Sequence, residues 1–241
     1  MKKGLYENLA ERWCETGSVW LYSDPHFSDV ESYRFRGLLV DSDFVDGRKL
    51  ANVVRSLDEM QIRNINRKVT NNDTLIILGD VGNVECVREL RGYKVLVMGN
   101  HDKGASNYRR EVKVTFDSTH MTEGDSILMR HGIGANELIR KYSKTIDNGL
   151  FDEVYEGPIM VNDRLMLSHE PIELPEFMFD IHGHVHSKQV ESGNSMNVCA
   201  ELMDYAPVNL CSMIECGLLK NVANVHRHTI DNAISRKGKH R

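Results

Sequence analysis

The sequence predicts an α/β fold with parallel strand pairing in its first half. At 241 residues the chain is long enough to bury a substantial core within one domain. Short apolar, β-prone runs alternate with helical segments over residues 19–98. A strand–helix–strand alternation of this kind is typical of parallel sheets.

The first strand is expected at residues 19–22, because this apolar run stops at Ser23-Asp24-Pro25-His26, where proline cannot continue a ladder. A helix is expected from Gly47 towards Val69. Its apolar positions recur at i, i+3, i+4 and i+7, which places one stripe on a helix face: Leu50, Val53, Val54 and Leu57. The remaining elements of this half are a strand at 74–78, a short helix at 84–90 and a strand at 93–98.

The second half of the chain predicts a more antiparallel sheet packed near the first. Its apolar runs are shorter and polar pairs separate them, and Asn162-Asp163 indicates a tight hairpin turn. Residues 135–144 form the main helical interruption. The expected strands are 112–116, 127–129, 159–161, 165–167, 178–181 and 196–198.

We expect a single domain over residues 1–220. Residues 104–157 are long enough to form a cap or flap on it. From residue 221 to 241 the composition becomes basic with few apolar positions, which favours a poorly ordered tail over a phosphate-binding arm. The sequence contains no internal repeat.

Charge and cysteine usage restrict the partners and the compartment. With 30 basic and 35 acidic residues the formal charge is −5, so the whole molecule does not attract nucleic acid or anionic lipid. The five cysteines are scattered, with no C-x-x-C pair, as in reduced intracellular proteins. No signal peptide and no run of roughly 20 apolar residues is present. We therefore expect a cytoplasmic protein without a membrane partner.

Five polar clusters share one property, because each begins where a strand-like run ends. Sites in α/β folds form beyond the carboxyl ends of strands, so these residues can meet in space. Carboxylate, imidazole and amide groups together suit borderline divalent transition metals. The clusters are Asp24-x-His26, Gly79-Asp80, Gly99-Asn100-His101-Asp102, His169 and Gly183-His184-Val185-His186.

These blocks, present in order from Asp24 to His186, resemble the pattern of the calcineurin-like metallophosphoesterases: D-x-H, G-D, G-N-H-D/E, a lone H and G-H-x-H. The local sequences around Asp24, Asp80, His169 and His184 are similar to those of small bacterial and phage members. The resemblance implies a four-layer α/β/β/α sandwich, in which two mixed sheets are flanked by helices.

The resemblance also implies the ligands of two divalent metal ions. One ion would be held by Asp24, His26 and His186, the other by Asn100, His169 and His184, and Asp80 would bridge them. Manganese is the expected metal, with iron, zinc and nickel as alternatives. A water or hydroxide between the ions would be the nucleophile, since coordination lowers its pKa. His101 would assist the leaving oxygen, and Asp102 would orient or charge that imidazole.

The expected activity is hydrolysis of a phosphomonoester or phosphodiester, with small nucleotides or other soluble phosphates favoured as substrates. The stretch after Asp80 reads Val81-Gly82-Asn83 and lacks the aspartate and arginine of phosphoprotein phosphatases, which argues against a protein phosphatase. Two alternatives stay open: a nuclease on single-stranded nucleic acid, and a catalytically silent binding scaffold of the same fold. Arg34 and Arg36 are expected either to steer a phosphate or to form a solvated face.

Overall fold

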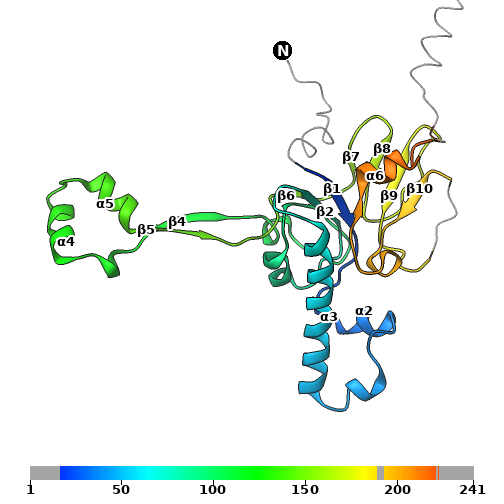
Figure 1. The fold of residues 1–241 in the computed structure, drawn as a ribbon, viewed down its shortest axis with the longest axis horizontal. Coiled ribbons are helices and arrows are strands. Elements are labelled where there is room, and N and C mark those ends of the chain that lie inside the picture. Colours follow the sequence, from blue (N-terminus) through cyan, green and yellow to red (C-terminus); the bar gives the residue numbers. More distant parts are fainter. Residues whose placement is uncertain (1–16, 189–192, 221, 223–241) are drawn as a thin grey trace, which may run out of the picture.

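Two mixed β-sheets form the body of the protein in this computed structural model, which describes residues 17–188, 193–220 and 222 (Figure 1). The first sheet has the order β11-β1-β2-β3-β6. Its central pairs β1–β2, β2–β3 and β3–β6 are parallel, and β11 is antiparallel to β1. The predicted parallel pairing of the first half is therefore confirmed. The bounds are β1 Val19–Tyr22, β2 Thr74–Leu78, β3 Tyr93–Val97, β6 Glu153–Tyr155 and β11 Val208–Asn209.

The second sheet is mainly parallel, so the expected antiparallel sheet was wrong. Only β7 and β8 pair antiparallel, through the predicted hairpin at residues 161–164. β8 pairs parallel with β9, and β9 with β10. Residues 168–178 and 183–194 join these strands, and connections of such length let the chain return to the same end of the sheet. The bounds are β7 Ile159–Met160, β8 Leu165–Leu167, β9 Phe179–His182 and β10 Ser195–Asn197.

An apolar core lies between the two sheets. Alternate residues of a strand point to opposite faces, so Val19 and Leu21 of β1 pack toward the second sheet while Tyr22 packs on the other side. Leu167 and Ile181 contribute from the second sheet to the same buried cluster. The first sheet is therefore apolar on both faces, which explains the continuous apolar runs of its strands.

The long helix α3 (Gly47–Lys68) covers the outer face of the first sheet. Ile62 and Ile65 of this helix share a buried cluster with Leu75 and Ile77 of β2. The helix begins after Asp46, whose carboxylate accepts a hydrogen bond from the Arg48 N–H. The other helical segments of the body are α2 Val30–Phe35, η1 Asp41–Asp43, η2 Val84–Glu89, η3 Ala105–Asn107, η5 Ala200–Met203 and α6 Leu210–Glu215.

An irregular segment contacts the outer face of the second sheet at β9. Residues 170–178 contain no helix or strand and lie against β9, where the Ile172 N–H donates to Asp180 Oδ2 at 3.0 Å. The Ser168 hydroxyl donates to the same carboxylate at 2.8 Å. Burial raises the pKa of Asp180 above its ordinary value. Within the described residues the layers are thus helix, sheet, sheet and this segment.

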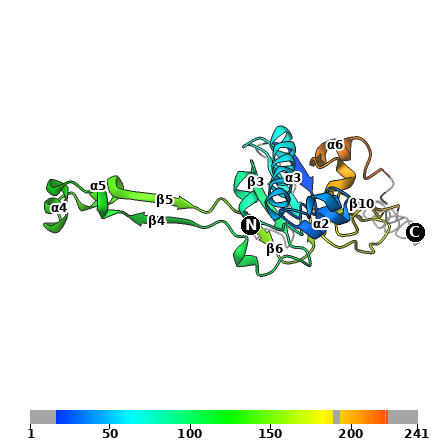
Figure 2. The same cartoon turned by 90° about the horizontal axis from the view of Figure 1, so that it is seen from below.

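Residues 112–147 form an arm that leads away from both sheets, so the region expected to be a cap or flap does not fold over the body (Figures 1 and 2). The shaft is the antiparallel pair β4 (Val112–Phe116) and β5 (Ser143–Asp147). Helices α4 (Glu123–Arg130) and α5 (Ala135–Tyr142) lie at the tip.

The strand expected at residues 127–129 is wrong, because these residues lie in α4. Thr122 caps this helix by accepting a hydrogen bond from the Asp125 N–H, and Glu123 adds negative charge in the first turn. The apolar run Ile127-Leu128-Met129 is short, and such runs do not distinguish strand from helix by themselves.

The arm joins the body through a polar junction. Arg110 forms ion pairs with Asp147 and Asp152, and the Glu111 and Asn148 backbones are hydrogen-bonded to each other at 3.1 Å. The buried Lys94 ammonium donates to the carbonyl oxygen of Val87 at 3.1 Å, and desolvation lowers its pKa. The two ends of the arm therefore leave and re-enter the body side by side.

The predicted basic tail at 221–241 lies outside the described residues, except for Val222, which is buried against the inter-sheet core. None of the described helices combines the length and apolar character needed to cross a bilayer.

We expect the arm to be dispensable for the fold of the body. Replacing residues 112–147 by two glycines joins chain ends that already hydrogen-bond, and it removes two partly or mostly exposed ion pairs, Arg110–Asp147 and Lys113–Glu111, together worth about 1 kcal/mol. The unfolding midpoint should fall by no more than about 4 °C. Calorimetry checks this. Loss of cooperative unfolding would contradict it. As a comparison, Phe151→Ala removes a fully buried ring beside the arm and should lower the free energy of unfolding by about 3–5 kcal/mol.

Candidate metal centre

The residues predicted to bind metal converge at the carboxyl ends of the strands in two neighbouring groups. Atoms that could bind a metal lie within 4.8 Å of one another in each group. The first group contains Asp24 and His26, which follow β1, together with His186. The second contains Asp80, which follows β2, together with His169 and His184.

Asn100 lies beside the second group. Its side-chain oxygen lies 2.9 Å from His169 Nε2 and 3.1 Å from His184 Nδ1. The two imidazole nitrogens are themselves 3.2 Å apart. Three donors of nitrogen and oxygen type thus face one point, and this donor set suits zinc, manganese, iron or nickel.

Asp80 lies between the two groups. Its Oδ2 atom is 3.5 Å from His26 Nε2 of the first group and 3.4 Å from His169 Nε2 of the second. Its other oxygen, Oδ1, accepts a hydrogen bond from the His101 backbone N–H at 2.9 Å. That hydrogen bond fixes the carboxylate so that Oδ2 faces both sets of imidazoles, which is the position a bridging ligand needs.

Two buried polar atoms of the first group support metal binding. Within the described part of the chain, neither Asp24 Oδ1 nor His26 Nε2 has a hydrogen-bond partner, and they lie 3.9 Å apart. A buried polar group without a partner is costly. Two ligands of one ion, each about 2 Å from it, are separated by such a distance. These residues therefore fit a divalent metal ion.

Neighbouring acceptors orient three of the four imidazoles in the two groups. His26 Nδ1 lies 3.0 Å from Asp29 Oδ2, His169 Nδ1 lies 2.9 Å from the Leu78 carbonyl oxygen, and His186 Nδ1 lies 2.8 Å from Glu201 Oε1. An acceptor at Nδ1 places the proton there and leaves the Nε2 lone pair available for a metal. His184 differs, because its Nδ1 faces the second group.

The backbone is strained in the loops after β1, β2 and β9, which carry residues of the two metal groups and are called the metal loops below. Asp24, His26, Asp80, His184 and His186 all have positive φ angles, between 46° and 67°. Residues with side chains rarely adopt this conformation, which costs on the order of 1–2 kcal/mol each, and such strain is concentrated at functional sites. Hydrogen bonds hold two of the loops together, from Asp24 N–H to Gly79 O and from His26 N–H to Asp80 O.

A buried polar network fixes the loop that carries Asp24 and His26. Gln61 of α3 donates to the Pro25 carbonyl at 3.0 Å and accepts from the Tyr22 hydroxyl at 2.6 Å. Asp58, one turn earlier in α3, accepts from the Ser28 backbone and side chain at 2.8 and 2.7 Å. The long helix therefore positions the first metal group as well as covering the sheet.

Charges within the site alter several pKa values. Burial raises the pKa of Asp80, but the hydrogen bond to His169 and nearby imidazoles outweigh it, so the pKa lies below its ordinary value. The His26 pKa is lowered by burial and then by the charge of Arg36. Burial lowers the His169 pKa, but contacts with Asp80 and Asp24 raise it to about 9. Asp80 and His169 thus stabilise each other's charged forms, and the carboxylates beside His169 favour a cation at this position.

His101 lies at the mouth of the site, with 67 % of its side chain exposed and Nε2 4.0 Å from Asp80 Oδ2. Our expectation for Asp102 needs correction. Its carboxylate oxygens accept hydrogen bonds from the backbone N–H groups of Gly99, Asp80 and Val81 at 2.9, 2.9 and 3.1 Å. Asp102 therefore holds the loop after β2 against the loop after β3, and it does not orient the His101 imidazole.

The two arginines whose role was open have different environments. Arg34 is exposed, pairs with Asp41 at 3.7 Å and lies over the Phe44 ring. The Arg36 side chain is only 1 % exposed; its Nη2 donates to the Asp24 carbonyl at 2.7 Å, and its Nε lies 3.4 Å from Glu201 Oε2. Arg36 therefore supports the first metal loop and does not reach out to a phosphate.

Sequence reasoning missed Glu201 and Cys199. Glu201 contacts both His186 and Arg36, and the Cys199 thiol donates to Asp24 Oδ2 at 3.2 Å. Both belong to the segment 198–201 that passes beside β1, where Ser23 and Cys199 form a bridge. No motif surrounds them, so only the three-dimensional structure could reveal them.

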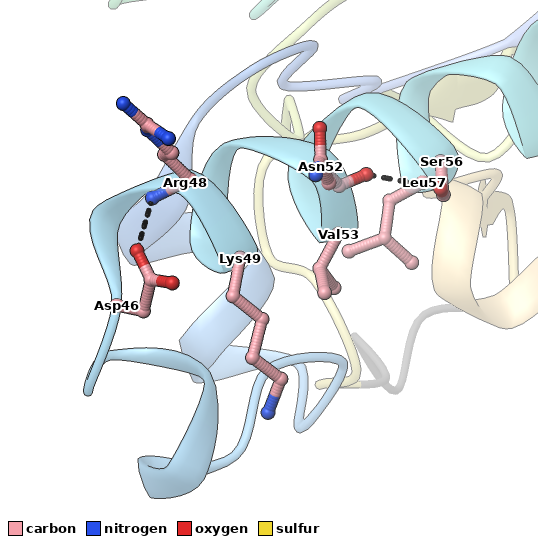
Figure 3. Close-up of a pocket in the computed structure, with 7 residues that line it drawn as sticks. All are labelled: Asp46, Arg48, Lys49, Asn52, Val53, Ser56 and Leu57. Atoms are coloured by element: carbon pink, nitrogen blue, oxygen red, sulfur yellow. Dashed lines mark hydrogen bonds between the residues drawn. The ribbon is translucent and has the colours of Figure 1, made fainter.

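A hollow of about 490 Å³ lies elsewhere, beside the first turns of α3 (Figure 3). It shares no residue with the two metal groups. Its acid, Asp46, is already used as the cap of α3, and Ser56 donates to the Asn52 carbonyl within the helix. Its lining residues are Asp46, Arg48, Lys49, Asn52, Val53, Ser56 and Leu57. We therefore assign the candidate site to the paired metal groups and not to this hollow.

Comparison with known proteins gives little further information. The sequence matches no family model, and no curated protein matches it. The crystal structure of AQ665, a protein of unknown function from Aquifex aeolicus, is similar, with 20% sequence identity and a TM-score of 0.48. The match covers 83% of this chain and 98% of that chain. Neither fold nor function is inferred from a similarity at this level.

The glycine before the H-x-H block should be essential for the site. A Cβ atom on Gly183 would overlap Ser23 Oγ and Asp24 Oδ2, which are fully buried. We expect Gly183→Ala to destabilise the protein by about 1–3 kcal/mol and to weaken metal binding. Urea unfolding with and without Mn²⁺ measures both effects. Gly157→Ala is the matched control, because a Cβ atom there meets nothing within 4 Å. Equal effects of the two substitutions would contradict this account.

Proposed function

We propose that this protein is a phosphoesterase that depends on two divalent metal ions and hydrolyses small phosphomonoesters or phosphodiesters. The observation that carries the proposal is the shared carboxylate of Asp80, which lies 3.5 Å from His26 Nε2 and 3.4 Å from His169 Nε2. A single carboxylate between two separate groups of nitrogen and oxygen donors is the arrangement of a two-metal site. Such sites are common in enzymes that cleave phosphate esters.

When bound, two divalent cations would supply Lewis acidity and lower the pKa of a water molecule that attacks phosphorus. Asp24, His26 and His186 would hold one ion, and Asn100, His169 and His184 the other, with Asp80 common to both. His101 would donate a proton from its exposed imidazole to the leaving oxygen. Its backbone N–H already holds Asp80, so the position of His101 and that of the bridging carboxylate are coupled.

The chain is further proposed to have the calcineurin-like metallophosphoesterase sandwich. Two stacked mixed sheets with ligands at their strand ends support this. One difference is that residues 170–178, which contact the outer side of β9, contain no helix. The net charge of −5 favours small substrates over long nucleic acid.

Metal binding tests the proposal directly. Chelator-treated protein should bind two Mn²⁺ ions in calorimetric titration, and His186→Ala should retain one high-affinity site. Glu201→Gln should weaken one of the two sites by about 10–100-fold, because Glu201 fixes the tautomer of His186. His120→Ala, an exposed residue on the arm, is the control and should bind as wild type. Binding of a single ion, or of none, by the wild type would refute the two-metal site.

The role of His101 can be separated from metal binding. His101→Ala should bind two Mn²⁺ ions with wild-type affinity, since its side chain is mostly exposed and belongs to neither metal group. Its kcat on bis-p-nitrophenyl phosphate and p-nitrophenyl phosphate should fall by about 10²–10⁴-fold. An unchanged kcat would remove His101 from the mechanism. No wild-type turnover of either ester with several metals would overturn the proposed activity.

A further inference from the structure

Phe35 is an exposed aromatic residue at the edge of the candidate metal centre. It is the last residue of α2, and 72 % of it is exposed. Its ring lies 5.8 Å from the ring of His186, at an interplanar angle of 62°. The Phe35 ring therefore lies beside His186, a member of the first metal group, and most of it is exposed to solvent.

The core of the protein gives no reason for a phenylalanine at this position. The buried residue of α2 is Tyr33, which packs with Leu39 and Val54, and Phe35 belongs to none of the buried apolar clusters. A large apolar side chain left in water loses the gain of burial, about 1.5–3 kcal/mol for phenylalanine. Single exposed apolar residues are common on protein surfaces, so it is the position of Phe35 beside His186 that points to a role at the site.

The surrounding chain fixes the position of Phe35. The next residue, Arg36, is buried and donates to the Asp24 carbonyl at 2.7 Å, which ties the end of α2 to the first metal loop. Gly37, with a φ of 71°, ends the helix, and hydrogen bonds from Gly37 and Leu38 return to Arg34 and Tyr33. The Phe35 ring is thus presented from an anchored backbone beside the metal ligands.

We propose that Phe35 is a stacking platform for a flat aromatic group of the substrate, so that the site favours nucleotides and aryl phosphates over aliphatic phosphate esters. This inference rests on the proposed phosphoesterase function. A phosphate held at the paired metal groups would place the attached base or aryl ring toward the solvent side, where Phe35 lies. Stacking of a base on an aromatic side chain contributes about 1–3 kcal/mol and tolerates different bases, because every base has a flat π-face.

Equilibrium binding tests this without relying on turnover. Ribose 5-phosphate carries a hydroxyl group where AMP carries the base, so we would compare their dissociation constants in Mn²⁺-loaded His101→Ala protein, where hydrolysis is slow. Adding Phe35→Ala should weaken AMP about tenfold and leave ribose 5-phosphate unchanged. Adding Phe35→Trp should retain AMP affinity. Phe116→Ala, at an exposed phenylalanine on the arm, is the matched control and should change neither.

The kinetics of the otherwise wild-type enzyme give a second readout. Phe35→Ala should lower kcat/KM for p-nitrophenyl phosphate about tenfold, mainly through KM, and leave that for glycerol 2-phosphate unchanged. Equal losses for aromatic and aliphatic esters, or no loss for either, would overturn the stacking role while leaving the phosphoesterase intact. If the wild type neither binds nor hydrolyses any of these esters, the proposed function itself fails, and the role of Phe35 fails with it.

Discussion

The buried carboxylates of Asp24 and Asp80 impose the main constraint on this structure. Asp24 is 0 % exposed and Asp80 is 2 % exposed, and burial of an ionised carboxylate is costly unless it is paired or coordinates a metal. Asp24 Oδ2 has partners in Ser23, Cys199 and the His184 backbone, whereas Asp24 Oδ1 has none among the described residues. The nearby Arg36 donates to the Asp24 backbone and does not neutralise its carboxylate. A bound cation is the simplest physical solution to this concentration of negative charge.

The strained loops follow from the same requirement. Three segments from different strands must approach closely enough for their side chains to share one cluster, and the small glycines next to the ligands allow this. Asp102 contributes by tying three backbone N–H groups of two loops to one carboxylate. Buried polar groups such as Asp102 therefore hold these loops in place, whereas an ordinary sheet edge has solvent-exposed turns. The hydrogen bonds of the buried groups offset part of the backbone strain.

Much of the fold and most of the candidate site could be predicted because both depend on local signals. The three central strands of the first sheet, β1 to β3, were readable from their apolar runs, and the residues of the two candidate metal groups from the polar clusters that follow such runs. The outer strands β6 and β11 were not predicted, because they are only three and two residues long. The parallel pairing of β8, β9 and β10 could not be predicted either. It depends on the path of the irregular connections between these strands, and the sequences of those connections have no periodicity. Glu201 escaped for a related reason, since no motif surrounds it and its partner His186 lies 15 residues away in the sequence. The role of Asp102 was misjudged because adjacency in sequence to His101 does not determine which donors a carboxylate meets in space.

The junction of the arm has a consequence for how the sequence of this protein can vary. Loop-closure entropy rises only slowly with length, by about 0.6 kcal/mol for each doubling. Here the hydrogen bonds between Glu111 and Asn148, and between Arg110 and Phe151, close the chain at the body surface whatever lies between them. Insertions and deletions beyond this point are therefore nearly neutral for the two sheets. The tip can change in size and composition under selection of its own, while the metal loops keep their geometry.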